Sequence, residues 1–173
     1  MSEFSLVVAA RRAVADQVIA LDLRDPHGAA LPSWAPGAHL DLILGSGRQR
    51  QFSLCGDPAD AATWRIAVLR ETAGRGGSQE VHDTLTEGAC VQVRGPRNHF
   101  PLEPASRYIF IAGGIGITPI RPMLAAAQAA GRSWTLHYGG RTGTSMAFGK
   151  ELHERYGAQV RLWPQDRTGL LDL

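Results

Sequence analysis

The stretch that decides the fold runs from residue 108 to residue 119 and reads YIFIAGGIGITP. Its first five residues form a continuous apolar run, which predicts a β-strand buried on both faces. Glycines then supply a tight turn, and the residues that follow predict a helix over residues 119–130. Thr118 suits the N-cap of this helix, and Pro122 falls in its first turn, where a missing N–H costs little. The stretch therefore predicts a strand, a turn and a helix in succession.

The sequence after this stretch continues the alternation of strand and helix. It predicts a strand over residues 133–138, a helix over residues 145–156 and a strand over residues 159–163. Phe148 and Leu152 fall on one face of the helix, and Gly157 suits its C-terminal end. Strands that alternate with helices predict a parallel sheet with right-handed crossovers, as in an incomplete Rossmann-like α/β domain.

The residues before the stretch have the pattern of β structure. Apolar and polar residues alternate over residues 18–24, 40–44, 64–68 and 91–93, with Gly, Pro and Asp turns between them. One helical piece interrupts them over residues 78–85. Short alternating strands at this spacing predict a small antiparallel Greek-key β-barrel. We therefore predict an α+β protein of two domains, with the barrel over residues 1–104 and the α/β domain over residues 105–173.

Composition excludes several classes of protein. The chain has 173 residues, 18 Lys and Arg against 16 Asp and Glu, and a formal net charge of +2. This balance, with no basic run among aromatic residues, gives no case for nucleic-acid binding. No apolar stretch approaches the roughly 20 residues that span a bilayer, and the start of the chain lacks the features of a signal peptide. We therefore expect a cytoplasmic protein that binds neither nucleic acid nor membrane.

The two cysteines, Cys55 and Cys90, exclude most metal sites. They are too few for the four thiolates of an iron–sulfur cluster, and the six histidines form no HxxxH pair that would suit zinc. We therefore predict no metal site in this chain. Two thiols in a chain of this size also indicate a reducing compartment rather than a disulfide-bonded protein.

A glycine-rich loop stands directly before the helical piece and consists of Gly74, Arg75, Gly76, Gly77 and Ser78. Glycines let backbone N–H groups approach an anion, and a helix N-terminus adds partial positive charge. The Arg75 side chain and the Ser78 hydroxyl complete a candidate phosphate cradle. The alternative is a flexible turn with Ser78 as an ordinary N-cap, and the loop alone does not decide between the two.

A second motif, Arg50-Gln51-Phe52-Ser53, stands at the end of a predicted strand. A cation, an aromatic ring and a hydroxyl within four residues can hold a flat, phosphorylated ligand. The alternative is a barrel strand with Phe52 in the core and Arg50 in solvent. Taken by itself, the motif favours this alternative.

The glycine turn of the deciding stretch is a third motif. Gly113, Gly114 and Gly116 follow a strand and open a helix, which is the context in which glycines let a pyrophosphate approach the backbone. The alternative is a tight connection that binds nothing. The next strand ends on Gly140 and Arg141 rather than on an acidic residue, and an arginine there favours a 2′-phosphate.

Together these motifs resemble a known family. Residues 50–55, 74–78, 95–102 and 113–119 have the order and spacing found in the flavin reductase components of Rieske-type oxygenases. The phthalate dioxygenase reductase and vanillate demethylase reductase group, within the ferredoxin–NADP reductase superfamily, is the one resembled. The resemblance covers nearly the whole chain.

The resemblance implies an NAD(P)H-dependent FMN oxidoreductase. Such an enzyme takes a hydride from NADH or NADPH onto flavin and passes electrons to a [2Fe–2S] centre, here outside the chain, on a ferredoxin domain or a Rieske-type oxygenase. Ser53, near flavin N5, and Thr118, where the nicotinamide docks, are the implied catalytic residues. The implied FMN-binding residues are Arg50, Gln51, Phe52, Ser53, Ala67, Val68, Leu69, Gly74, Arg75, Gly76, Gly77, Ser78 and Thr118. The implied NAD(P)-binding residues are Gly113, Gly114, Gly116, Thr118, Pro119, Gly140 and Arg141.

The sequence departs from the family pattern at two points. Phe52 stands where the family usually has Tyr, so ring stacking is kept and a phenol hydrogen bond is lost. The later nucleotide-domain segments and the ferredoxin domain of the family are not matched. We therefore expect flavin binding to be retained, because its motifs lie in the barrel, whereas tight nucleotide binding and onward electron transfer depend on the segments that are not matched. An open sheet edge rich in Val160 and Leu162 is a further expected site of association.

Two alternative functions stay open. One is a non-catalytic flavin-binding or partner-docking module derived from such a reductase. The other is a reductase of the same superfamily that uses FAD or free flavin. No aromatic residue suited to hold an adenine is evident between Ser78 and Cys90, so FMN is preferred.

Overall fold

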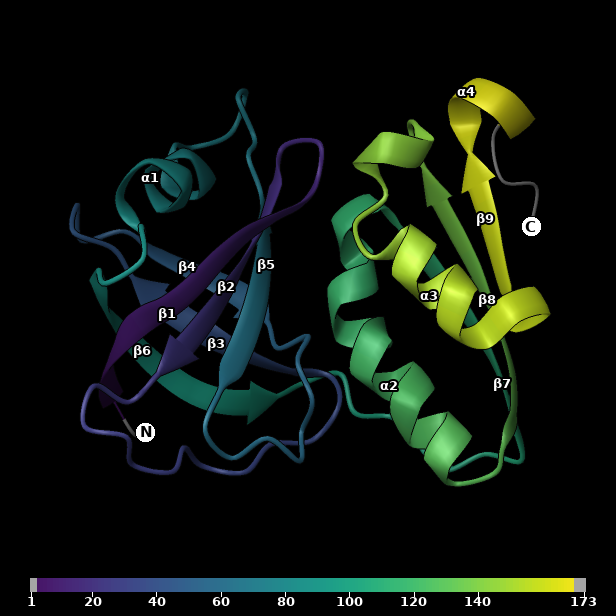
Figure 1. The fold of residues 1–173 in the computed structure, drawn as a ribbon, viewed down its shortest axis with the longest axis horizontal. Coiled ribbons are helices and arrows are strands. Elements are labelled where there is room, and N and C mark those ends of the chain that lie inside the picture. Colours follow the sequence, from purple (N-terminus) through teal and green to yellow (C-terminus); the bar gives the residue numbers. More distant parts are fainter. Residues whose placement is uncertain (1–2, 170–173) are drawn as a thin grey trace.

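The computed structural model describes residues 3–169, and its strands form two sheets (Figure 1). The first sheet is antiparallel and contains β1 (Glu3–Ala15), β2 (Val18–Arg24), β3 (Ala38–Ile43), β4 (Gln49–Ser53), β5 (Trp64–Leu69) and β6 (Cys90–Asn98). The second is parallel and contains β7 (Arg107–Gly113), β8 (Ser133–Gly140) and β9 (Val160–Pro164). The helices are α1 (Gly77–Thr84), α2 (Ile117–Ala129), α3 (Gly149–Tyr156) and α4 (Gln165–Thr168).

The antiparallel sheet curls into a half-barrel. Its strand order is β4-β3-β6-β1-β2-β5, so β6 lies between β3 and β1 although it is the last of these strands in the chain. An isolated bridge between Leu54 and Ile66 links the end of β4 to β5. Alternate side chains such as Leu21, Leu40 and Trp64 are fully buried in the interior. The predicted antiparallel barrel is confirmed, and β1 is a strand that the sequence pattern did not single out.

The parallel sheet is confirmed, but the prediction that its first strand is buried on both faces is wrong. The buried residues of α2 and α3 join Phe110, Leu136 and Val160 in one apolar cluster, so both helices cover the same face, which is turned toward the half-barrel (Figure 1). On the opposite face, Ile109 is 63% exposed and Ile111 is 49% exposed. An apolar run gives the strand but does not say how many layers cover it.

Helix α2 begins at Ile117 rather than at residue 119, because the 3-10 turn Gly114–Gly116 runs directly into it. Its N-cap is Gly116, and the Thr118 hydroxyl donates to the Ile115 carbonyl at 2.9 Å. The prediction that Thr118 is the N-cap is therefore wrong, because Thr118 lies in the first turn of the helix. Pro122 lies beyond that turn, so the prediction for Pro122 is also wrong.

The predicted helix over residues 145–156 is divided in the structure. A 3-10 turn, Gly143–Ser145, comes first, and α3 begins only after Phe148, whose backbone is left-handed with φ of 60°. Phe148 and Leu152 are both buried, but Phe148 precedes the helix instead of lying on its face. Gly157 ends α3 with φ of 57°, as predicted.

The half-barrel and the parallel sheet share one apolar cluster. Val18, Ala20, Cys55 and Ala67 of the half-barrel pack in the cluster that contains the buried faces of α2 and α3. The two parts of the molecule therefore meet through packed side chains as well as through the connecting chain. This contact places Cys55, two residues after the end of β4, in the same cluster as the buried face of α2.

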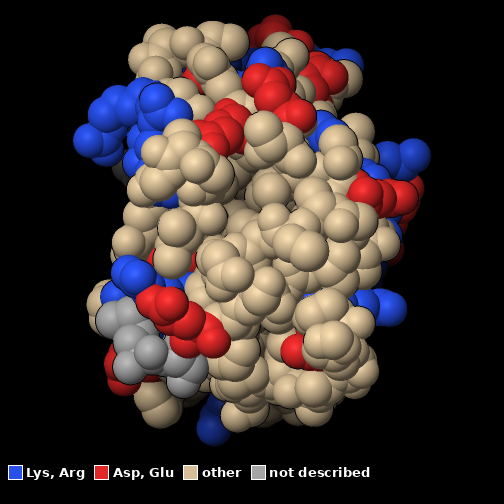
Figure 2. All heavy atoms as spheres, turned by 90° about the vertical axis from the view of Figure 1, so that its left-hand side faces the viewer, with Lys and Arg blue, Asp and Glu red and all other residues tan. Residues whose placement is uncertain are grey.

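The surface carries mixed charges. On the face that Figure 2 shows, acidic and basic side chains are interspersed around a broad area of other residues, so no single sign of charge dominates it. Among residues 3–169, no helix has the length and apolar character needed to cross a bilayer.

Candidate functional site

A cleft of about 460 Å³, here called the motif cleft, lies between the half-barrel and the start of α2. Ligand pockets commonly have volumes of about 300–1,000 Å³. The residues that line it are Arg50, Gln51, Phe52, Ser53, Ala67, Leu69, Glu71, Arg75, Gly77, Ser78, Ile115, Gly116, Thr118 and Pro119. Three motifs that are far apart in the sequence therefore meet in one cavity.

Arg50 brings a positive charge into the motif cleft. Its Nη1 donates to the Gln49 carbonyl at 2.8 Å and its Nη2 to the Arg75 carbonyl at 3.4 Å, and no carboxylate in residues 3–169 bonds to it. The side chain crosses the space beside Gly77, where an added Cβ would lie 2.4 Å from Arg50 Nε. A guanidinium bonded only to neutral carbonyls keeps its charge available for an anion.

The glycine-rich loop is held by two side chains of α1. The Ser78 hydroxyl accepts a hydrogen bond from the Glu71 N–H at 3.0 Å, and the Gln79 amide donates to the carbonyls of Glu71 and Thr72, each at 3.0 Å. The N-cap of α1 is Gly76, so the alternative that made Ser78 the N-cap is wrong. Because Ser78 accepts that bond, its hydroxyl hydrogen remains available to a ligand in the cleft.

An aromatic ring and two hydroxyls complete the lining. Phe52 is half-buried and packs against the barrel core, which holds its ring in place. Ser53 is half-buried, and Thr118 is only 6% exposed. Because Thr118 donates its hydroxyl hydrogen to Ile115, its oxygen can act only as an acceptor. A flat ring with polar edges matches this set of groups.

The glycine turn before α2 leaves open space. An added Cβ at Gly113, Gly114 or Gly116 would meet no atom of residues 3–169 within 4 Å, so packing does not require these glycines. Gly114 has φ of 50°, which side chains disfavour. Gly116 lines the motif cleft, whereas Gly113 and Gly114 lie beyond it at the carboxyl end of β7. Ligands of open parallel sheets bind at such strand ends.

The predicted nucleotide residues of β8 have a second explanation. An added Cβ at Gly140 would lie 2.4 Å from Cγ of Met146, so packing alone requires glycine there. Arg141 is exposed next to it. Neither residue lines the motif cleft, although the carboxyl end of β8 lies beside that of β7 in the parallel sheet.

Three predicted flavin residues do not line the cleft. Val68 is fully buried in the barrel core, while Ala67 and Leu69 on either side of it face the cleft. The two-residue period of a strand was the signal that could have excluded Val68. Gly74 and Gly76 belong to the loop but lie outside the lining. Glu71 and Ile115 line the cleft without belonging to the predicted set.

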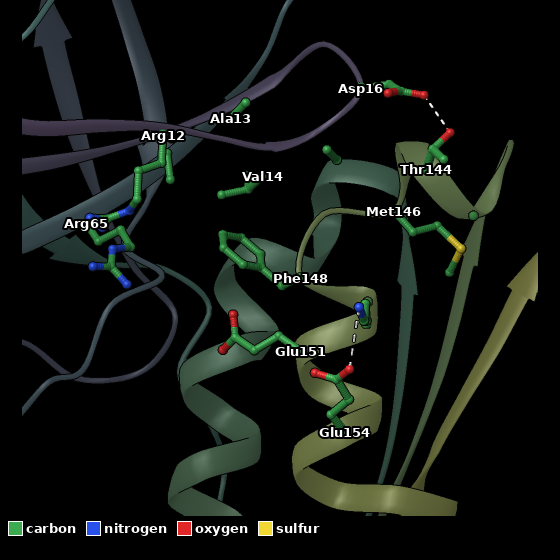
Figure 3. A pocket seen from close by; sticks show the side chains of 15 residues that line it. Arg12, Ala13, Val14, Asp16, Arg65, Thr144, Met146, Phe148, Glu151 and Glu154 are labelled. Carbon is green, nitrogen blue, oxygen red and sulfur yellow. Dashed lines mark hydrogen bonds and ion pairs between the residues drawn. The ribbon is translucent and has the colours of Figure 1, made fainter.

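A larger cleft of about 810 Å³, here called the hairpin cleft, opens between the β1–β2 hairpin and α3 (Figure 3). None of the predicted site residues lines it. Its cations are already paired, since Arg12 and Arg65 bond to Asp22 at 2.6 Å and 2.5 Å and Lys150 lies 3.7 Å from Glu154. Burial raises the pKa of Asp22, but hydrogen bonds from Arg65 and Arg12 outweigh burial and hold the pKa below its ordinary value.

Comparisons with known proteins agree with this geometry. Residues 110–169 match the family model described as an oxidoreductase NAD-binding domain. The chain is 43% identical to the phenoxybenzoate dioxygenase subunit beta of Ectopseudomonas oleovorans, over 94% of this chain and 51% of that protein. It is 41% identical to phthalate dioxygenase reductase of Burkholderia cepacia, over 85% of this chain and 46% of that protein.

The chain is also 41% identical to a vanillate O-demethylase oxidoreductase of a Pseudomonas species, over 83% of this chain and 45% of that protein. It therefore spans about half the length of these relatives. A solved phthalate dioxygenase reductase, described as modular for electron transfer from pyridine nucleotides to [2Fe–2S], is similar with a TM-score of 0.93 and 37% identity. That alignment covers 99% of this chain and 55% of the other.

Proposed function

The chain belongs to the family of phthalate dioxygenase reductase and vanillate O-demethylase oxidoreductase, and from this premise we propose that it is a flavoprotein reductase component. It carries electrons from NADH or NADPH through FMN toward an iron–sulfur centre of a Rieske-type oxygenase system. The observation that carries the proposal is the motif cleft, which joins Arg50 and Ser78 to Ser53 and Thr118 in one cavity.

The residues of the motif cleft fit FMN in charge and shape. Arg50, Arg75 and the Ser78 hydroxyl hold the phosphate, helped by the backbone N–H groups at the start of α1. Bound FMN would supply the chemistry that joins two-electron hydride transfer to the release of single electrons. Ser53 and Phe52 line the same cleft, where the Ser53 hydroxyl would donate a hydrogen bond to an edge nitrogen of the flavin and the Phe52 ring would pack beside it. The packed barrel core behind Phe52 keeps water from that side.

The nucleotide is placed by the turn before α2. Gly113, Gly114 and Gly116 leave the backbone open at the carboxyl end of β7, where a pyrophosphate can approach. Thr118 and Pro119 hold the nicotinamide against the flavin side of the cleft. Arg141 favours NADPH over NADH through its charge, because the 2′-phosphate is an anion.

The visible absorption spectrum of the purified chain tests the proposal first. We expect a flavin band, a released chromophore with the mass of FMN, and bleaching of the band by NADH or NADPH without oxygen. Reconstitution with FMN and, separately, with FAD compares the two flavins. A colourless protein that takes up neither flavin contradicts the proposal.

A second candidate is a flavin-binding or docking module without nucleotide turnover. Two observations favour it. Packing against Met146 already explains why residue 140 is a glycine, and Arg141 lies outside the motif cleft. The two candidates separate in the same experiment. A protein that binds FMN but is not reduced by either nucleotide is this module.

The immediate partner and the compartment complete the proposal. The acceptor is a ferredoxin domain or the oxygenase itself, and the cytoplasm is supported by the two unpaired thiols, Cys55 and Cys90. The Val160 side chain is buried against the core and cannot form an association surface. Association through the edge strand β9 would therefore use the backbone N–H and carbonyl groups along its outer side. Sedimentation at several protein concentrations tests that association, and a monomer at all of them rejects it.

A further inference from the structure

Arg121 of α2 connects the two halves of the molecule, about one helical turn after Thr118 of the motif cleft. Its side chain is only 16% exposed. We propose that Arg121 is a positioning residue that fixes the flavin segment at the end of β4 relative to the turn that carries Thr118. The expected effect on the rate of flavin reduction rests on the proposed function. The expected effect on the packing around Cys55 can be measured in the protein without flavin.

Three contacts hold the Arg121 guanidinium. Nη1 donates to the backbone carbonyl of Cys55 at 2.5 Å, and Nη2 donates to Oε1 of Glu151 at 2.6 Å. The guanidinium carbon lies 5.0 Å from the centre of the Phe148 ring, a cation–π distance. One side chain therefore joins the half-barrel, α2 and α3.

The contact with Cys55 acts close to the reacting groups. Cys55 follows Ser53 by two residues, and its own N–H donates to the Arg65 carbonyl at 2.8 Å. Thr118 precedes Arg121 by three residues, about one turn of the same helix. One helical turn thus links Thr118 to Arg121, and a hydrogen bond links Arg121 to Cys55, two residues after Ser53. Ser53 and Thr118 face the same cavity from opposite halves of the molecule.

A second polar contact between the halves serves as the comparison. The Asp16 N–H donates to the Thr144 carbonyl at 2.9 Å, and the Thr144 hydroxyl donates to Oδ2 of Asp16 at 2.5 Å. Asp16 is exposed at the tip of the β1–β2 hairpin, and Thr144 is exposed in the 3-10 turn Gly143–Ser145, so both line the hairpin cleft (Figure 3). This contact joins the same two halves but touches no residue of the motif cleft.

Hydride transfer depends steeply on distance, and a misplacement of about 1 Å can cost about 100-fold in rate. The test compares Arg121→Gln, Arg121→Lys and the control Thr144→Val in the FMN-loaded protein. We expect Arg121→Gln to lower the limiting rate of flavin reduction by NADH about tenfold, with FMN affinity and the half-saturating NADH concentration changed less than twofold. Arg121→Lys regains part of the rate, because an ammonium can still donate to the Cys55 carbonyl. Thr144→Val leaves the rate unchanged.

The thiol of Cys55 gives a second readout that needs neither flavin nor turnover. Burial raises its pKa to about 12, so it is protected from alkylation in the closed structure. In a Cys90→Ser background, we expect Arg121→Gln to speed alkylation of Cys55 at least fivefold, with Thr144→Val and Arg121→Lys closer to the parent. This measurement stands even if the protein binds no flavin, a result that would reject the proposed function alone.

Two results would overturn the positioning role. One is unchanged Cys55 protection and an unchanged reduction rate in Arg121→Gln. The other is a loss of FMN affinity or a change confined to the half-saturating NADH concentration, since either shows that Arg121 acts on binding rather than on placement. If Arg121→Gln does not fold, Arg121→Lys provides the test. The proposal requires this variant to reduce flavin more slowly than the parent and to expose Cys55 to faster alkylation.

Discussion

The motif cleft and the hairpin cleft lie on the two sides of the contact between the half-barrel and the helices, and they differ in a way that volume does not reveal. The hairpin cleft is larger, about 810 Å³ against about 460 Å³. Two of its cations, Arg12 and Arg65, share the carboxylate of Asp22, and the third, Lys150, pairs with Glu154. In the motif cleft, Arg50 bonds only to carbonyl groups. An uncompensated charge, rather than the size of the cavity, distinguishes the site that can bind a phosphate.

Removal of the free charge is expected to have the largest effect. Arg50→Gln should weaken FMN binding about 10- to 100-fold, because hydrogen bonds to charged groups are worth about 1.5–3 kcal/mol. Fluorescence titration of FMN against the apoprotein measures the change. The matched control is Arg12→Gln in the hairpin cleft, for which FMN affinity should stay within twofold. Equal losses in the two variants would erase the distinction between the clefts.

A single methyl group at Gly77 should displace the same charge indirectly. The added Cβ of Gly77→Ala would lie 2.4 Å from Arg50 Nε, so the guanidinium must move. We expect FMN affinity to fall about tenfold, less than for loss of the charge, because the arginine remains nearby. Gly143→Ala is the control in the hairpin cleft, since its Cβ would meet no atom of residues 3–169 within 4 Å. The same titration should find Gly143→Ala equal to the parent.

The paired charges of the hairpin cleft should govern stability rather than binding. The pKa of Asp22 is held below its ordinary value in the folded protein, so its stabilising contribution is present above the pKa of the unfolded chain, about 3.9. The contribution is lost as pH falls through the folded pKa. Asp22→Asn should reduce the free energy of unfolding at pH 7 by about 1–3 kcal/mol, because two arginines lose their shared acceptor.

Urea unfolding at a series of pH values measures this contribution. The difference between the parent and Asp22→Asn should be constant from pH 7 to pH 5 and should shrink below about pH 4. FMN affinity of the folded variant should not change. If the difference in unfolding free energy between the two proteins grew as the pH fell, its sign would be opposite to that expected for Asp22. The loss of stability in acid would then belong to another group.

The contrast between the clefts also explains what the sequence could predict. Arg50, Ser53, Ser78 and Gly116 were predicted because each belongs to a short motif whose chemistry is local to a turn or a strand end. The pairing of Asp22 with Arg65 joins residues 43 positions apart, and no short pattern encodes it. Such pairs depend on strand register, which becomes known only with the fold.

Other differences between sequence and structure have the same origin. The exposure of Ile109 depends on which layers cover the sheet, and the apolar run that contains it says nothing about layers. Phe148 has a left-handed backbone, although helix periodicity placed it within a helix. Arg121 looks like an ordinary helix residue in the sequence, and only the tertiary fold brings Cys55, Phe148 and Glu151 to its side chain.

The smallest expected effect comes from filling the larger cleft. Ala13 is exposed on β1 and lines the hairpin cleft, so Ala13→Trp should occupy much of that cavity. We expect FMN affinity within twofold of the parent, since none of the residues that line the motif cleft is touched. The indole would press on the contact between Asp16 and Thr144, which can slow flavin reduction, whereas weaker FMN binding would contradict this expectation. FMN affinity measures the motif cleft itself, and the rate of flavin reduction measures how the two halves are placed. A variant with the parent's FMN affinity and slower reduction would therefore separate binding in the motif cleft from the packing that positions its two sides.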